Sequence, residues 1–191
     1  MRYASQLVDT GDGEGKLRSL PPVHLWDPPF CGDINLKIAS DGTWFYEGTP
    51  IGRAKLVRLF STVLKKEGDD YFLVTPVEKL GIQIEDAPFL AVLCGVEKQN
   101  DVQIIKFQTN VGDEVIASKE HPLDYRDTAR GDDQAPYVMV RGGLEAKIGR
   151  SVFYELVEYG ETRTIDGREH FGVMSSGLFF PFGLADDIFG S

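Results

Sequence analysis

Two arginines in this chain occupy positions where a cation needs a compensating partner. Arg53 and Arg150 each follow an Ile-Gly pair and precede a segment whose apolar residues recur at helical spacing. The start of a helix favours a carboxylate over a cation. A phosphate held by the arginine and the helix N–H groups would compensate, and so would a buried carboxylate partner such as Asp86 or Glu145. The sequence leaves both interpretations open.

A second set of polar side chains lies at the end of an expected strand. The apolar run over residues 71–74 stops at Thr75-Pro76, and Glu78 and Lys79 follow directly. A hydroxyl, a carboxylate and an ammonium thereby gather at a strand end, where proteins often mount binding groups. In the alternative interpretation Thr75 closes the turn, while Glu78 and Lys79 are solvated loop charges.

Enzyme signatures are incomplete in this chain. The glycine-rich run over residues 11–16 lacks the spacing of a phosphate-binding loop, and Leu17 stands where that loop needs Ser or Thr. Ser175 does not lie in a nucleophile elbow, because Val173 occupies the position of a required glycine. The histidines are too scattered for a recognisable ligand set: His24, His121 and His170. A non-enzymatic protein is therefore the leading expectation, and the sequence names no cofactor.

Charge and cysteine content limit the classes of partner and the cellular location that we expect. The formal net charge is −10, so nucleic acid and anionic membrane surfaces would on average repel the protein, and we expect neither as a partner. Cys31 and Cys94 lie far apart and outside any CxxC motif, which is typical of reduced thiols. Neither a signal peptide nor a membrane-spanning stretch is evident. These features favour a cytoplasmic location.

The spacing of apolar residues predicts an α+β fold of two β-rich units with one main helix each. Residues 34–46 alternate around an Asp41-Gly42 turn, which is typical of a hairpin. In that hairpin Trp44 and Tyr46 either form part of the core or offer a stacking surface for a base.

A repeated tripeptide suggests how the two units are related. Ile51-Gly52-Arg53 opens a helical pattern that is expected to end near Gly68, and Ile148-Gly149-Arg150 opens the one over residues 148–157. Each pattern is followed by a turn and a strand-like segment. We therefore expect an internal duplication that places an equivalent arginine in each unit.

Changes in composition suggest the domain boundaries. We expect a flexible tail over residues 1–20, an N-terminal α+β domain over 21–87 and a C-terminal β-rich domain over 88–191. Within the C-terminal domain, the acidic stretch over residues 111–136 is expected to be a solvated loop, apart from a short strand over residues 114–117 that ends a three-stranded antiparallel set.

Several ordered blocks carry a family resemblance: Gly32-Asp33-Ile34, Asp41-Gly42-Thr43-Trp44, Gly48-Thr49-Pro50-Ile51-Gly52-Arg53, Leu59-Phe60-Ser61, Leu73-Val74-Thr75-Pro76-Val77-Glu78-Lys79, Glu85-Asp86-Ala87-Pro88-Phe89, Val140-Arg141-Gly142-Gly143-Leu144-Glu145-Ala146 and Arg150-Ser151-Val152-Phe153-Tyr154. In these blocks the chain resembles an uncharacterised bacterial family catalogued as domain of unknown function 1285. The resemblance implies a duplicated core, a C-terminal part similar to pleckstrin-homology-like folds, and an interdomain cleft for a nucleotide-like ligand in signalling. The cleft positions that carry over to this sequence are Arg53, Thr75, Glu78, Lys79, Asp86, Arg141 and Arg150.

Three functional hypotheses follow. The first is a binding or regulatory protein in which Arg53, Lys79 and Arg150 hold a small anionic, nucleotide-like ligand, oriented by Glu78 or Asp86. The second is a protein-interaction adaptor that uses a β edge or the phenylalanine-rich segment over residues 178–182. The apolar character of Phe179, Phe180 and Phe182 also predicts that this segment packs against the protein. An uncharacterised enzyme is the third.

Overall fold

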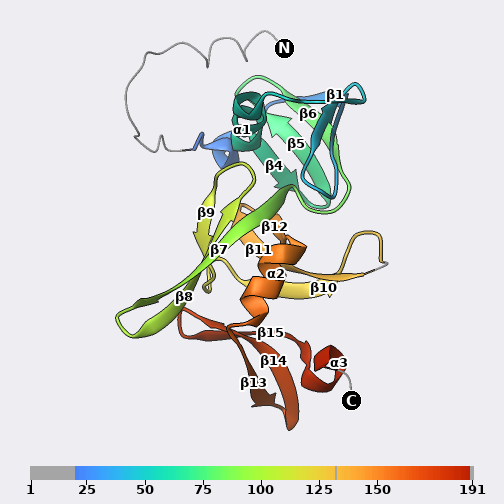
Figure 1. The fold of residues 1–191 in the computed structure, drawn as a ribbon. Coiled ribbons are helices and arrows are strands. Elements are labelled where there is room, and N and C mark those ends of the chain that lie inside the picture. Colours follow the sequence, from blue (N-terminus) through green and yellow to red (C-terminus); the bar gives the residue numbers. More distant parts are fainter. Residues whose placement is uncertain (1–19, 132, 190–191) are drawn as a thin grey trace.

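The computed structural model describes residues 20–131 and 133–189 and consists of two strand-rich units followed by a small third sheet (Figure 1). The predicted tail over residues 1–20 lies outside the described residues except for Leu20. The first unit contains a short 3₁₀ helix, six strands and one α-helix: η1 (Val23–Leu25), β1 (Phe30–Ile38), β2 (Trp44–Tyr46), β3 (Thr49–Pro50), α1 (Ala54–Thr62), β4 (Leu64–Glu67), β5 (Asp70–Val74) and β6 (Lys79–Ile84).

The first sheet has the strand order β3-β2-β1-β6-β5-β4. The predicted hairpin is β1 and β2, in which Leu36 pairs with Tyr46 and Ile38 with Trp44. Its turn needs a left-handed backbone, which Gly42 supplies at φ +83°. The strands β1 and β6 lie parallel at the centre, and every other neighbouring pair is antiparallel.

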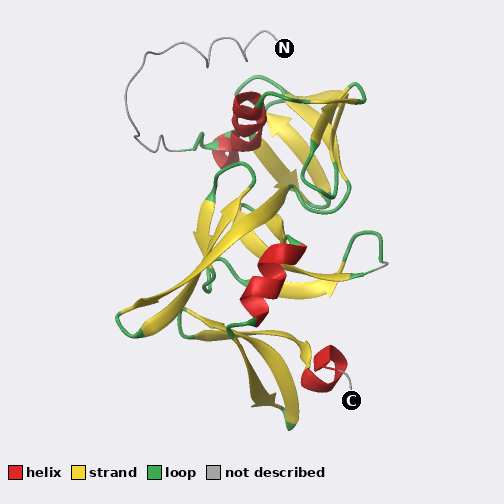
Figure 2. Ribbon diagram, viewed as in Figure 1, coloured by secondary structure: helices red, strands yellow, loops and turns green. Residues whose placement is uncertain are grey.

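The second unit is also a six-stranded sheet. Its elements are β7 (Phe89–Gln99), β8 (Val102–Thr109), β9 (Glu114–Ile116), β10 (Leu123–Asp127), β11 (Gln134–Arg141), β12 (Leu144–Ile148) and the helix α2 (Arg150–Val157). A third sheet and a short helix follow: β13 (Gly160–Ile165), β14 (Arg168–Ser175), β15 (Leu178–Leu184) and α3 (Ala185–Phe189). Figure 2 shows that strands dominate throughout, with α1 beside the first sheet and α2 between the second and third sheets.

The two six-stranded sheets share one topology. The second sheet has the order β10-β11-β12-β7-β8-β9, with β7 and β12 as its parallel central pair. Each unit is therefore a three-stranded meander followed by a second meander, and the first strand of the unit pairs in parallel with the last. This is the duplicated two-domain architecture that the sequence predicted.

The register predicted for the duplication was wrong. The helix α1 lies between the third and fourth strands of the first unit, whereas α2 follows the sixth strand of the second unit. Arg53 and Arg150 therefore do not occupy equivalent positions. The reason is that strand pairing over a whole sheet defines the repeat, whereas a recurring tripeptide reflects only local helix initiation.

Other boundaries also differ from those expected. The predicted first helix ends at Thr62, and Leu64 begins β4, which turns through Gly68 at φ +61° to pair with β5. Within the acidic stretch over residues 111–136, the strand expected at residues 114–117 is confirmed as β9, whereas β10 lies where a solvated loop was expected. Val115 and Leu123 are buried there.

The phenylalanine-rich segment forms β15, and its predicted packing is confirmed. Phe180 and Phe182 are buried, and the Phe182 ring contacts the rings of Tyr125 and Phe153. This burial contradicts the use of the whole segment as a contact surface, since both side chains face the protein interior. At its outer end Leu178 stays exposed.

One hydrophobic core runs through both units and into the third sheet. Trp44 stacks on Phe60 of α1, with ring centroids 6.5 Å apart, so the hairpin aromatic Trp44 is core. Tyr46 on the same strand is 42% exposed. Within the described residues, no helix has both the length and the apolar character needed to cross a membrane.

Candidate functional site

A pocket of about 430 Å³ opens at the seam between the two units. The first unit contributes the β1–β2 turn and the segment that leads into α1, while the second contributes the β8–β9 turn. The lining residues are Gly42, Thr43, Trp44, Ile51, Gly52, Ala54, Lys55, Val57, Arg58, Asn110, Val111 and Gly112. A site of this kind needs both units, because neither contributes a complete wall.

Asn110 holds the two turns together. Its Nδ2 donates a hydrogen bond to the Gly42 carbonyl oxygen at 3.2 Å, and its Oδ1 accepts one from the Leu90 amide at 3.1 Å. A Cβ at position 42 would clash with the Asn110 amide group. The glycine therefore serves the turn and also allows the second unit to approach the first.

Arg58 joins the helix α1 to the opposite wall. Its Nη1 donates a hydrogen bond to the Val111 carbonyl oxygen, and the next residue, Gly112, has φ +83°. A side chain at position 112 would meet the Arg58 guanidinium. Positive φ and close approach thus both select glycine at this point of the pocket wall.

The charge of the pocket is opposite in sign to that of the protein. Lys55 and Arg58 are its charged lining residues, and no carboxylate from the described residues lines it. The Lys55 ammonium has neither an ion-pair nor a hydrogen-bond partner in residues 20–131 and 133–189. A cation left free beside a helix start is available to an anion.

Trp44 adds a buried donor to the same wall. Its side chain is 2% exposed. Among the buried side-chain nitrogen and oxygen atoms of the described residues, Trp44 Nε1 is the one without a hydrogen-bond partner. Leaving such a donor unpaired costs about 1–3 kcal/mol, and buried tryptophan nitrogens usually find a partner.

Arg53 and Arg150 have different surroundings in the structure. Arg53 is the N-cap residue of α1 between the pocket residues Gly52 and Ala54, and its side chain is exposed without a partner in the described part of the chain. Arg150 begins α2, is 78% exposed, and lies 3.7 Å from Asp133. Neither arginine pairs with Asp86 or Glu145, so the proposed carboxylate partners were wrong.

The Thr75 segment is a structured turn. Thr75 Oγ1 accepts a hydrogen bond from the Glu78 amide at 3.1 Å, which closes the turn between β5 and β6. Lys79 forms an ion pair with Glu67 at 2.8 Å and lies over the Phe72 ring. The Glu78 hydrogen bond supports the interpretation of Thr75 as a turn-closing residue. Lys79 is not a solvated loop charge, because it begins β6 and its ammonium is paired with Glu67.

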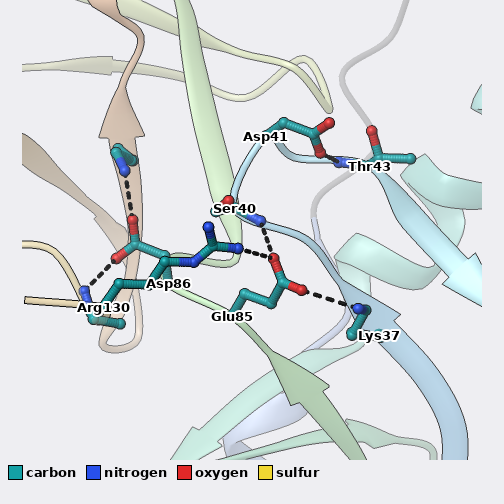
Figure 3. A network of polar contacts seen from close by, with 9 residues as sticks. Lys37, Ser40, Asp41, Thr43, Glu85, Asp86 and Arg130 are labelled. Carbon is teal, nitrogen blue, oxygen red and sulfur yellow. Dashed lines mark hydrogen bonds and ion pairs between the residues drawn. The ribbon is translucent and has the colours of Figure 1, made fainter. Parts of the chain in front are cut away.

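Asp86 lies in the connection between the two units, where polar contacts converge from both sides (Figure 3). Its side chain is 5% exposed, and it accepts hydrogen bonds from Lys147 Nζ at 2.7 Å and Tyr137 Oη at 2.8 Å. The Ala129 amide adds a third at 3.3 Å. Burial opposes ionisation of Asp86, but these hydrogen bonds outweigh it and hold its pKa below the usual value.

The neighbouring Glu85 faces the first unit. Lys37 Nζ donates to it at 2.9 Å, the Ser40 amide donates at 3.0 Å, and Arg130 of the second unit lies 3.3 Å away (Figure 3). The Lys37 and Ser40 hydrogen bonds lower the pKa of Glu85. Glu85 and Asp86 therefore form a polar joint between the units, in which both carboxylates are held by several hydrogen bonds.

Arg141 also joins the units. Its guanidinium pairs with Asp113, donates to the Ser61 carbonyl oxygen at 2.8 Å, and lies 4.8 Å from the centre of the Phe89 ring. The seven predicted positions are thus divided between the polar joint, a turn, the helix starts and this bridge, and none of them lines the pocket.

Sequence reasoning missed the residues that form the pocket. Lys55 and Arg58 lie one helical turn apart in α1, which is a recognisable signal for a cationic face. Asn110 and Gly112 are brought to that face only by the packing of the β8–β9 turn. No pattern in the neighbouring sequence indicates that these two residues line a pocket.

The family model of the N-terminal domain of DUF1285, a domain of unknown function, matches residues 21–87, and that of the DUF1285 C-terminal domain matches residues 88–182. The chain belongs to this family. No curated protein matches it.

Two solved structures of family members are similar to this chain. A DUF1285 protein from Silicibacter pomeroyi DSS-3 is 49% identical over 91% of this chain and 92% of its own, with a TM-score of 0.82. A DUF1285 protein from Shewanella baltica OS155 is 34% identical over 64% of this chain and 90% of its own, with a TM-score of 0.51.

Proposed function

We propose that this DUF1285 protein is a non-enzymatic binding or regulatory protein that takes a nucleotide-like or other small anionic ligand in the pocket at the seam. One observation carries the proposal: the pocket presents Lys55 and Arg58 as its charged groups in a protein of net charge −10. Cations concentrated in a concave site of an acidic protein attract a small anion and leave large polyanions repelled.

Size and lining agree with a small molecule. The volume of about 430 Å³ falls within the range of about 300–1,000 Å³ that is usual for ligand sites. Ile51, Val57 and Val111 provide apolar walls beside the two cations. A ligand with an anionic group and a flat or apolar body uses both features.

The regulatory part of the proposal rests on the position of the pocket. A ligand that contacts α1 and the β8–β9 turn together favours the arrangement in which both are close. Such coupling suits a cytoplasmic signalling protein of bacteria. The similarity of the C-terminal unit to pleckstrin-homology-like folds, which the family resemblance implies, remains a prediction.

Thermal melting in the presence of anionic probes tests the proposal. A panel of inorganic phosphate, ribose 5-phosphate and the four ribonucleoside monophosphates is suitable. A probe at one hundred times its Kd stabilises the protein by about 2.7 kcal/mol, which raises the Tm by roughly 5–10 °C for a chain of this size. The absence of a shift with every probe contradicts the proposal.

Charge reversal identifies the site. Lys55→Glu is expected to weaken binding of a stabilising probe at least tenfold while leaving the unliganded Tm close to that of the native protein, because Lys55 is exposed and unpaired. Lys98→Glu on the β7–β8 hairpin makes the same change in net charge away from the pocket, and should leave binding unaffected. Equal losses in the two variants would show an effect of net charge instead of a site.

A further inference from the structure

The indole of Trp44 combines a well-packed ring with an unpaired N–H. Its ring stacks on Phe60 at an interplanar angle of 22°, and its backbone carbonyl accepts a hydrogen bond from the Ile51 amide at 2.8 Å. The ring thereby connects β2 to α1, and the backbone connects β2 to the segment that precedes α1. The Nε1 atom is closed to solvent and has no hydrogen-bond partner within residues 20–131 and 133–189.

Packing does not account for the indole nitrogen. A phenylalanine at position 44 would keep an aromatic ring against Phe60 without an unsatisfied donor. The polar group is therefore a liability in the unliganded protein. It becomes favourable only when an acceptor reaches it.

The pocket is where such an acceptor can arrive. Trp44 lines it together with Gly52, Lys55 and Arg58. A Cβ at Gly52 would meet no atom within 4 Å, so the wall beside the helix start is open. For a ligand atom to reach the buried Nε1, this wall must move, and the new hydrogen bond would offset the cost of that movement.

We propose that the Trp44 N–H is the specificity-determining donor of the seam pocket, and that it binds an acceptor oxygen or ring nitrogen on the body of the ligand. This inference rests on the proposed function. Lys55 and Arg58 then hold the anionic group, while Ile51, Val57 and Val111 contact the body. The ligand class is a small anion with an acceptor-bearing ring, the chemistry of a nucleoside monophosphate.

The indole N–H resonance provides a direct test on the native protein. The chain has two tryptophans, so a ¹⁵N-labelled sample gives two side-chain signals, with Trp26 as the internal reference. A nucleoside monophosphate is expected to move the Trp44 proton downfield as the hydrogen bond forms. Ribose 5-phosphate, which has the anion but no base, is expected to leave it in place.

A single substitution gives the second readout. Trp44→Phe should weaken binding of the nucleoside monophosphate about tenfold and leave the affinity for ribose 5-phosphate unchanged, because only the base supplies the acceptor. Trp26→Phe is the matched control and should alter neither affinity. The resonance experiment uses the native chain, so the test does not depend on the stability of Trp44→Phe.

The outcomes separate the two proposals. If nucleoside monophosphates bind but the Trp44 signal stays in place and Trp44→Phe binds equally well, the inference about the indole is wrong while the proposed function stands. If no nucleoside monophosphate binds and ribose 5-phosphate and phosphate also fail, both are wrong. If ribose 5-phosphate binds as tightly as the nucleotides, the base is not read and the inference is again overturned.

Discussion

Arg141 of the second unit donates a hydrogen bond from Nη2 to the carbonyl oxygen of Ser61 in α1, 2.8 Å away. Ser61 is 2% exposed, and the Arg141 guanidinium also pairs with Asp113 near the β8–β9 turn. One side chain therefore connects the last turn of α1 to the turn that lines the pocket. The relative placement of the pocket walls depends on this bridge.

Removing this bridge should destabilise the protein. Arg141→Ala leaves the half-buried Asp113 carboxylate and the Ser61 carbonyl without their partner, and we expect the free energy of unfolding to fall by about 2–4 kcal/mol in chemical denaturation. Arg150→Ala is the control, because its guanidinium is 78% exposed, and should change stability by less than about 0.5 kcal/mol. Equal effects of the two substitutions would contradict a bridging role.

The joint at Asp86 predicts a pH dependence of stability. Its pKa in the folded protein lies below the ordinary value of 3.8, so the unfolded chain binds more protons as the pH falls. Its contribution to stability is therefore complete above about pH 4 and is lost as the pH falls through the lower pKa of the folded state.

Asp86→Asn isolates that contribution. At pH 7 the variant should be less stable by about 2–4 kcal/mol, because the half-buried Lys147 loses its counter-charge. The difference from the native protein should shrink below pH 4, where Asp86 itself becomes protonated. Denaturation at a series of pH values measures this difference, and a gap that stays constant down to pH 2 would show that the carboxylate charge is unimportant.

Ser175 ties the third sheet to the second unit. Its Oγ accepts a hydrogen bond from the Ile105 amide at 2.9 Å and donates one to the Ala117 carbonyl oxygen at 2.7 Å, with no exposed surface. Ser175→Ala leaves the buried amide unpaired and should cost about 2–3 kcal/mol in urea denaturation. Thr164→Ala, on the exposed face of β13, serves as the control with a loss within about 0.5 kcal/mol.

The two cysteines should differ in reactivity. Burial, followed by the nearby Glu155 carboxylate, raises the pKa of Cys94 to about 11, whereas Cys31 is exposed. At pH 8 the Cys94 thiolate is then roughly a thousandth of the population, so alkylation followed by mass spectrometry should show one fast and one slow site. Cys31→Ser should remove the fast reaction, and Glu155→Gln should accelerate the slow one. Two sites with equal rates would contradict the effect of the Cys94 environment.

Local pattern was enough to predict many of the elements. The β1–β2 hairpin follows from alternation around Asp41-Gly42, and α2 follows from helical spacing up to Val157. The apolar character of Phe180 and Phe182 also predicted their burial correctly. Each of these features depends on residues that are close together in the chain.

The pairing of the duplicated units could not be obtained in the same way. The match of β1–β6 with β7–β12 is a property of hydrogen bonds between distant strands, including the parallel pairs β1·β6 and β7·β12. The repeated Ile-Gly-Arg tripeptide indicated a duplication but gave the wrong alignment, because helix initiation uses similar residues wherever it occurs.

The sequence by itself determined that this is an acidic, strand-rich protein of two related units, because composition and short-range periodicity record burial and secondary structure directly. Tertiary structure alone decided which cations are free. Lys79 and Arg141 are engaged by carboxylates distant in the sequence, whereas Lys55 lies unpaired at the pocket, within the part of the chain that the structure describes. An ion pair forms where folding brings opposite charges together, and a local sequence pattern does not indicate which distant residues will be in contact.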